Sequence, residues 1–273
     1  LAMIQDDTII PLFLTAMFFL IVNRRWRSGA LIGSLGVVTK IFPGLVAPLM
    51  FVSPSDWKTR VQVIVIGFGV ALLVCLPFLL LAKSEFSVFI EFYLFGIEPV
   101  KEIAGSESDL GFVRGMSVWA FLHRVGITVP TWLLHGLLVI AISACWACVW
   151  LKKIDSPRAF TLCILSLIIL YSKVHYGYHL MALCALIPWS MHDARRLWGI
   201  FFASLIAGAV HTGSLSSVFW DSRIESYELG WAFLIAAVML WSFWIWVARQ
   251  LISGPDLASR WSGEIDEDEI VNN

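Results

Sequence analysis

Charged side chains are scarce in this chain of 273 residues: Asp, Glu, Lys and Arg make up 14% of it, whereas hydrophobic residues make up 59%. The mean hydropathy is +0.82. A soluble domain rarely departs so far from average composition, and repeated apolar runs of about 20 residues are typical of membrane spans. The formal net charge is −1, and no basic cluster indicates a nucleic-acid partner. The composition therefore excludes an ordinary soluble protein and predicts one polytopic membrane domain.

Cysteine patterns that would indicate a metal or redox centre are also lacking. All five cysteines fall inside apolar runs (Cys75, Cys145, Cys148, Cys163 and Cys184). Cys145 and Cys148 form a C-x-x-C pair, but no His or further Cys lies close to it in the sequence. We interpret this pair as helix packing and assign no metal site. The fourteen tryptophans are interpreted mainly as markers of the membrane interface.

Seven apolar runs are predicted to be membrane-spanning helices, which makes the fold class all-α. They cover residues 8–22, 61–82, 127–151, 159–171, 176–189, 197–220 and 230–252. We predict a multi-span membrane domain over residues 1–252. Within it, residues 83–123 form a long outer loop that carries interfacial helices at 86–95 and 116–122. Residues 253–273 are an acidic cytoplasmic tail, expected to be disordered.

An eighth apolar segment, Ser28–Val52, is interrupted near its middle by Lys40, Pro43 and Pro48. A Lys in the centre of a membrane helix costs about 3 kcal/mol on insertion scales, so such residues usually face protein or a watery cavity. Pro43 donates no backbone hydrogen bond and breaks a helix. Broken membrane helices are tolerated where the freed backbone is buried or lines a cavity. A kinked span with Lys40 reaching the interface is the alternative.

The basic connections distinguish these two topologies. Basic residues accumulate in cytoplasmic loops, and four clusters are candidates: Arg24/Arg25/Arg27, Lys58/Arg60, Lys152/Lys153/Arg158 and Arg195/Arg196. If Ser28–Val52 crossed once, the first two clusters would lie on opposite faces. If it enters and returns to the same face, all four clusters are cytoplasmic together. We therefore predict a re-entrant or broken helix with Lys40 and Pro43 near its tip.

On this topology, several polar side chains meet in the outer half of the membrane. A basic group there suits a ligand with an anionic head, and a lipid phosphate is the economical candidate. The neighbouring carboxylates of Asp6 and Asp7 could serve as a general base or as ligands of a divalent metal ion, so a metal cofactor is left open. The residues concerned are Gln5, Asp6, Asp7, Lys40, Arg114, Lys173, His175 and His179.

These residues also follow a known pattern. Gln5-Asp-Asp-Thr, an apolar run, Arg24-Arg25, a small-residue run and then Lys40-Ile-Phe-Pro43 with Pro48 resemble the polyprenyl-phosphate-mannose-dependent mannosyltransferases. Those are integral-membrane members of the GT-C glycosyltransferase superfamily. Arg114-Gly-Met-Ser117 is similar to their Arg/Ser loop segment. Ser172-Lys-Val-His-Tyr-Gly-Tyr178 is similar to their late Lys-x-His-x-x-Tyr element. The resemblance covers roughly residues 1–190.

The resemblance implies transfer of a hexose, with mannose as the sugar, from a polyprenyl-phosphate donor to a lipid or glycan acceptor. It implies the plasma membrane of a prokaryote, with the active face outward. Lys40 and Arg114 would contact the donor phosphate, and Lys173 and His175 the phosphate or the sugar. Membrane lipid and the lipid-linked donor are the expected partners, and no protein partner is assigned. Contacts to sugar or acceptor would come from Gln5, Asp6, Asp7, Ser117 and Tyr178.

In this superfamily the catalytic carboxylate sits in the first outer loop, after the first span. The resemblance therefore implies a catalytic residue upstream of Leu1, and we expect the given chain to be processed or truncated. Two other functions remain open. A transporter or flippase of a lipid-linked anion would use broken helices and buried cations in the same way, although no internal repeat is visible. A non-catalytic lipid-binding subunit is the third possibility.

Overall fold

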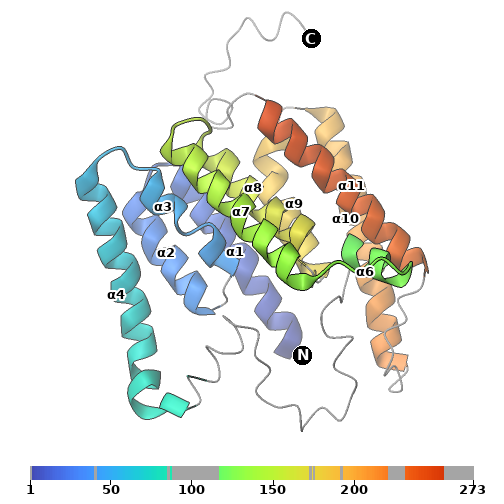
Figure 1. Ribbon diagram of the computed structural model, residues 1–273, viewed down its shortest axis with the longest axis horizontal. Coiled ribbons are helices and arrows are strands. Elements are labelled where there is room, and N and C mark those ends of the chain that lie inside the picture. The colour runs from blue at the N-terminus through green and yellow to red at the C-terminus, as the bar shows by residue number, and fades with distance from the viewer. Residues whose placement is uncertain are drawn as a thin grey trace, which may run out of the picture. The chain divides into compact units, whose positions relative to one another are not determined.

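The computed structural model describes residues 2–39, 42–84, 87, 117–171, 174, 176–190, 193–220 and 231–254, and these residues form helices and short connections with no β-sheet among them. Each of the seven predicted spans coincides with a helix of the described chain (Figure 1), which confirms the all-α prediction. These helices are α1 (Ala2–Val22), α4 (Trp57–Leu81), α7 (Thr131–Trp150), α8 (Ser156–Leu170), α9 (Tyr176–Ser190), α10 (Ala194–Trp220) and α11 (Trp231–Ser253).

Shorter elements lie between the long helices. They are α2 (Trp26–Thr39), the 3₁₀ turn η1 (Phe42–Leu45), α3 (Leu49–Val52) and α6 (Val118–Arg124). The chain divides into two compact units, Leu1–Gly111 and Phe112–Asn273. The first unit contains α1 to α4 and the second contains α6 to α11.

Several helices begin earlier than their apolar runs predict, because polar capping residues set the first turn. Asp56 is extended, and its carboxylate accepts a hydrogen bond from the backbone N–H of Thr59 at 2.7 Å. This hydrogen bond lowers the pKa of Asp56 and fixes the start of α4 four residues before position 61. Asp155 caps α8 in the same way, through the backbone N–H of Arg158. α1 begins at Ala2 rather than at Thr8, so Gln5, Asp6 and Asp7 lie on its first turns.

In the first unit, the segment 28–52 folds back on itself as a broken helical hairpin. A Cβ built on Gly36 of α2 would lie 2.9 Å from Cβ of Pro43, and one on Gly33 would lie 3.5 Å from Cβ of Ala47. Nearer the start of α2, a Cβ on Gly29 would overlap the sulfur of Met50. From Gly36 to Gly29 of α2, the facing residues run in the opposite order, from Pro43 to Met50. α2 and the returning segment 43–50 are therefore antiparallel. The predicted break and return are therefore confirmed, with a glycine face that permits the close approach.

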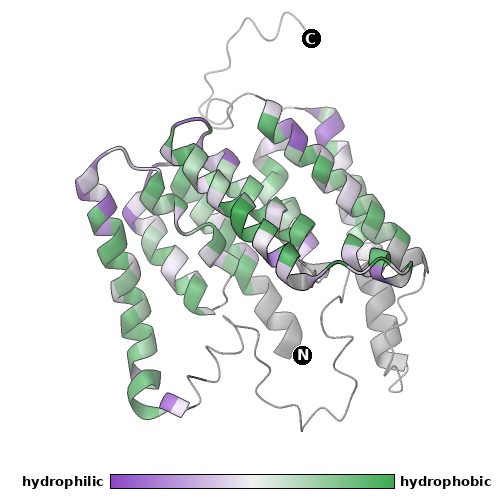
Figure 2. Cartoon of the chain, viewed as in Figure 1, coloured by the Kyte–Doolittle hydropathy of each residue, from purple (hydrophilic) through white to green (hydrophobic). Residues whose placement is uncertain are grey.

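The first unit exposes an apolar surface suited to lipid. Among the described residues, three helices are long and apolar enough to span a membrane, and they lie in α4, α7 and α11. On α4, Phe68 and Leu73 are each 75% exposed and Leu81 is 87% exposed, and Figure 2 shows the helix as hydrophobic along its length. Large apolar faces of this kind are not left in contact with water. The chain is an integral membrane protein.

α8 forms the core of the second unit. It is buried along most of its length, and α7, α9 and α11 pack around it. At its start, the buried Arg158 lies 3.6 Å from the carboxylate of Asp155 and donates a 2.7 Å hydrogen bond to the carbonyl of Gly254, just after α11. These contacts fix the first turn of α8 against the end of α11.

Candidate functional site

The first unit brings the start of α1 and the tip of the hairpin to one end. α1 and α2 are antiparallel neighbours joined by a short turn: Phe13 faces Gly36, and Met17 faces Gly33. At 1.5 Å per residue, Asp6 lies about 24 Å from the end of α1, and Thr39 lies about 20 Å from the start of α2. Figure 1 shows both ends on the same side of the unit. The segment Gln5–Asp7 therefore extends about one turn past the last residue of α2.

The hairpin tip contains the predicted break. Pro43 is buried in η1, its carbonyl accepts the backbone N–H of Ala47 at 2.9 Å, and Pro48 precedes α3. Lys40 lies outside the described residues, as do the side chains of Gln5, Asp6 and Asp7. What the structure does describe is the last turn of α2, which ends at Thr39. A helix C-terminus presents carbonyl oxygens and a partial negative charge. The end of α2 therefore has no free backbone N–H groups that could bind an anion.

In the second unit, two indole groups converge on the end of α8. Trp119 of α6 and Trp241 of α11 both donate to the carbonyl of Ile169, at 2.9 and 3.2 Å, and their rings meet edge to face. Because α8 ends at Leu170, this carbonyl has no partner within the helix. The two indoles satisfy this carbonyl and thereby hold the end of α8, with Ile169 three residues before Ser172. Ser117 lies two residues before Trp119 and is only 2% exposed.

The start of α9 is held by a second aromatic contact. Nε1 of Trp244 donates to Nδ1 of His179 at 2.8 Å, and the two rings are stacked. Since an indole N–H is only a donor, Nδ1 is unprotonated and the neutral imidazole carries its proton on Nε2. Tyr178, the residue before His179, is half-buried. At the start of α7, His135 stacks on Tyr171 with ring centroids 5.6 Å apart.

The predicted site residues of the second unit are therefore only partly visible. Arg114, Lys173 and His175 lie outside the described residues. Trp241 and Trp244 of α11 hold Ile169 and His179, which lie on either side of the segment 172–175. The interpretation of the tryptophans as interface markers missed these two roles. The spacing of three residues between the two tryptophans places them on one helix face, which was the available signal. His179 inside an apolar run was a second signal, because a buried imidazole needs a partner.

Within the part of the chain that the structure describes, no three His, Cys, Asp or Glu side chains are grouped so that they could hold a metal ion. The described residues show a broken helical hairpin in the first unit and an aromatic framework in the second unit.

The family of the chain follows from comparison with known proteins. The model of glycosyltransferase family 87 matches residues 3–172, which is more than half of the chain, and the chain belongs to this family. It is a membrane glycosyltransferase of the GT-C type, a class that typically uses lipid-linked sugar donors. Comparisons with curated proteins and with solved structures found no match. The matched region contains the whole hairpin and Arg114, and it ends immediately before Lys173.

Proposed function

We propose that this protein transfers mannose from a polyprenyl-phosphate donor to a lipid or glycan acceptor on the outer face of a prokaryotic plasma membrane. The observation that carries the proposal is the family match across the hairpin, together with the position of its tip. The described residues on either side of the tip, Thr39 and Phe42, lie at the same end of the first unit as the start of α1, and the sequence places Lys40 between them. A cation beside hydrogen-bonding groups suits a phosphate-linked sugar.

In the proposed reaction, a hydroxyl of the acceptor attacks the anomeric carbon of the sugar. The bond between this carbon and the phosphate oxygen breaks, polyprenyl phosphate leaves with the electron pair, and a general base takes the proton of the acceptor hydroxyl. Lys40 and Arg114 stabilise the negative charge that develops on the phosphate. Because the end of α2 supplies carbonyls rather than N–H groups, this role falls on the side chains.

The remaining proposed residues bind rather than react. Lys173 and His175 contact the phosphate or the sugar. Hydrogen bonds to sugar hydroxyls or to the acceptor come from Gln5, Asp6, Asp7, Ser117 and Tyr178. Ser117 is buried, so the acceptor or sugar reaches it only if the residues that cover it move.

The donor is tested with membranes that contain the protein, incubated separately with polyprenyl-phosphate mannose, polyprenyl-phosphate glucose and a nucleotide-linked mannose, each radiolabelled in the sugar. We expect label to pass to a lipid or glycan acceptor only from polyprenyl-phosphate mannose. Transfer from the glucose donor alone would overturn the sugar assignment. Movement of the intact donor across the bilayer without transfer would instead establish the flippase alternative.

The orientation of the hairpin makes a separate prediction. If segment 28–52 is re-entrant, cysteines in Arg24→Cys and Ser55→Cys variants should both react with an impermeant maleimide only from the cytoplasmic side. A Lys83→Cys variant, at the far end of α4, should react only from outside. The chain with its own five cysteines provides the background signal. Labelling of positions 24 and 55 from opposite sides would contradict the re-entrant topology.

A further inference from the structure

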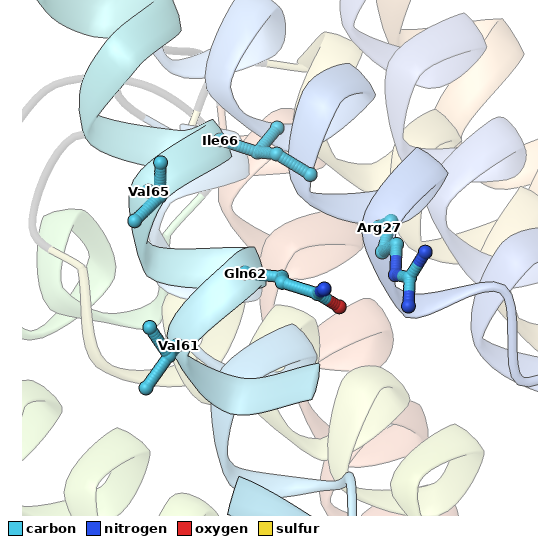
Figure 3. A pocket seen from close by; sticks show the side chains of 5 residues that line it. All are labelled: Arg27, Val61, Gln62, Val65 and Ile66. Atoms are coloured by element: carbon cyan, nitrogen blue, oxygen red, sulfur yellow. The ribbon is translucent and has the colours of Figure 1, made fainter. Parts of the chain in front are cut away.

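A hollow lies between the start of α2 and the first turns of α4, at the opposite end of the first unit from the hairpin tip. It measures about 300 Å³ and is lined by Arg27, Val61, Gln62, Val65 and Ile66. Figure 3 shows Arg27 of α2 and Gln62 of α4 pointing toward each other across it, with Val61 and Val65 on the outer side of α4. Arg27 occupies the first turn of α2, about 18 Å from Thr39. The hollow is therefore separate from the proposed sugar-transfer site.

The polar side of the hollow suits an anionic headgroup that also carries a hydrogen-bond donor. The Arg27 side chain is exposed, and its guanidinium offers the forked donors that match a phosphate. The side-chain oxygen of Gln62 is buried and has no hydrogen-bond partner among the described residues. An unpaired buried acceptor is costly, so a hydroxyl on a ligand that reached it would gain a hydrogen bond without displacing a protein partner.

The surrounding charge favours an anion. Arg24, Arg25 and Lys58 are exposed on the same connections. The nearby acid is Asp56, whose carboxylate already accepts the N–H of Thr59 and whose pKa is lowered chiefly by that hydrogen bond, with a smaller contribution from the charge of Arg27. Asp56 thus offsets part of the positive charge, and an excess of cations remains at this end of the unit.

The apolar side of the hollow continues as a track along α4. Val61, Val65, Phe68 and Leu72 are 39%, 64%, 75% and 59% exposed. Their spacing of four, three and four residues places them on one face of the helix. The track is about 16 Å long, which matches much of the length of an extended acyl chain within one leaflet.

We propose that this hollow binds one anionic phospholipid with a hydroxylated headgroup, of the phosphatidylglycerol type. The phosphate contacts Arg27, and the side-chain amide of Gln62 rotates toward the hollow so that its oxygen accepts a hydrogen bond from a headgroup hydroxyl. One acyl chain lies along the exposed face of α4. Such a lipid bridges α2 and α4 and thus supports the hairpin from the end opposite its tip.

The proposal is tested by native mass spectrometry of the detergent-solubilised protein titrated with phosphatidylglycerol or with phosphatidylcholine of the same acyl chains. We expect one phosphatidylglycerol to bind with at least tenfold higher affinity than phosphatidylcholine. An Arg27→Gln variant should weaken this binding about tenfold. An Arg25→Gln variant removes the same charge two residues away without touching the hollow, and it should change the affinity less than twofold.

A second variant separates the hollow from general electrostatic attraction. Val65→Trp fills the exposed apolar side while leaving every charge in place, and we expect it to weaken phosphatidylglycerol binding at least fivefold. Equal losses in Arg27→Gln and Arg25→Gln, or unchanged binding in Val65→Trp, would overturn the proposal. Equal affinity for the two lipids in the unmodified protein would also overturn it.

Discussion

Replacing Lys40 with alanine is expected to lower the rate of sugar transfer by about 10²–10³-fold, the loss typical of removing one group that stabilises charge in a transition state. The residue follows α2 directly, at an end where the helix itself presents carbonyl oxygens. No backbone N–H group of α2 can replace the lost ammonium there. The measurement is the initial rate of mannose transfer from polyprenyl-phosphate mannose in membranes with matched amounts of protein.

The matched control for Lys40 is Lys58→Ala, which removes the same side chain from the first turn of α4, at the other end of the unit. Its transfer rate should remain within twofold of the unmodified protein. Both variants should insert into the membrane to the same extent, because each removes a positive charge without adding a polar group. An unchanged rate in Lys40→Ala would remove Lys40 from the proposed site, whereas equal losses in both variants would indicate a general effect of charge.

The second large effect is expected from Gly36→Val in α2. A Cβ at this position would lie 2.9 Å from Cβ and 3.1 Å from Cγ of Pro43, and 3.3 Å from Cβ of Phe13. The proline ring is fixed to its backbone and cannot rotate away, so the hairpin must open. Overpacking of this kind costs about 1–3 kcal/mol, occasionally more. We expect a corresponding fall in the free energy of unfolding, measured in mixed micelles by titration with a denaturing detergent.

Gly69→Val is the control for this substitution. Gly69 lies in the interior of α4, and a Cβ built there meets no atom within 4 Å. Both variants replace a helical glycine by valine, so they share the change in helix propensity and differ in the contact with Pro43. The Gly69 variant should be as stable as the unmodified protein or slightly more stable. Equal stability of the two variants would contradict the tight packing of the hairpin.

Features that depend on nearby residues were predictable from the sequence, whereas contacts between distant residues were not. Apolar runs predicted each long helix because a membrane span depends on its own composition. The helix starts were less accurate: Asp56 and Asp155 extend α4 and α8 beyond the apolar runs, since a cap depends on one polar side chain rather than on hydropathy. The broken hairpin was predictable from Pro43 together with the distribution of basic loops, because both signals are written along the chain.

For the candidate site, the sequence predicted which types of residue take part but not how they are arranged in space. A motif can suggest that Lys40 and the start of α1 act together. Only the antiparallel packing of α1 on α2, through Phe13 and Met17 against the glycines, shows that the start of α1 and the end of α2 lie at one end of the unit. The family assignment rests on the match over residues 3–172. The residues proposed to bind the donor and the acceptor are still predictions.

The sequence by itself determined the membrane class, the helical segments and the position of the break, because hydropathy and proline act on the residues nearby. Only the tertiary structure decided which distant groups meet. Trp119 and Trp241 share the carbonyl of Ile169, and Trp244 pairs with His179. Arg27 and Gln62 face one hollow. Each of these arrangements involves residues on different helices, and the register that brings them together is set by packing across the helix interfaces.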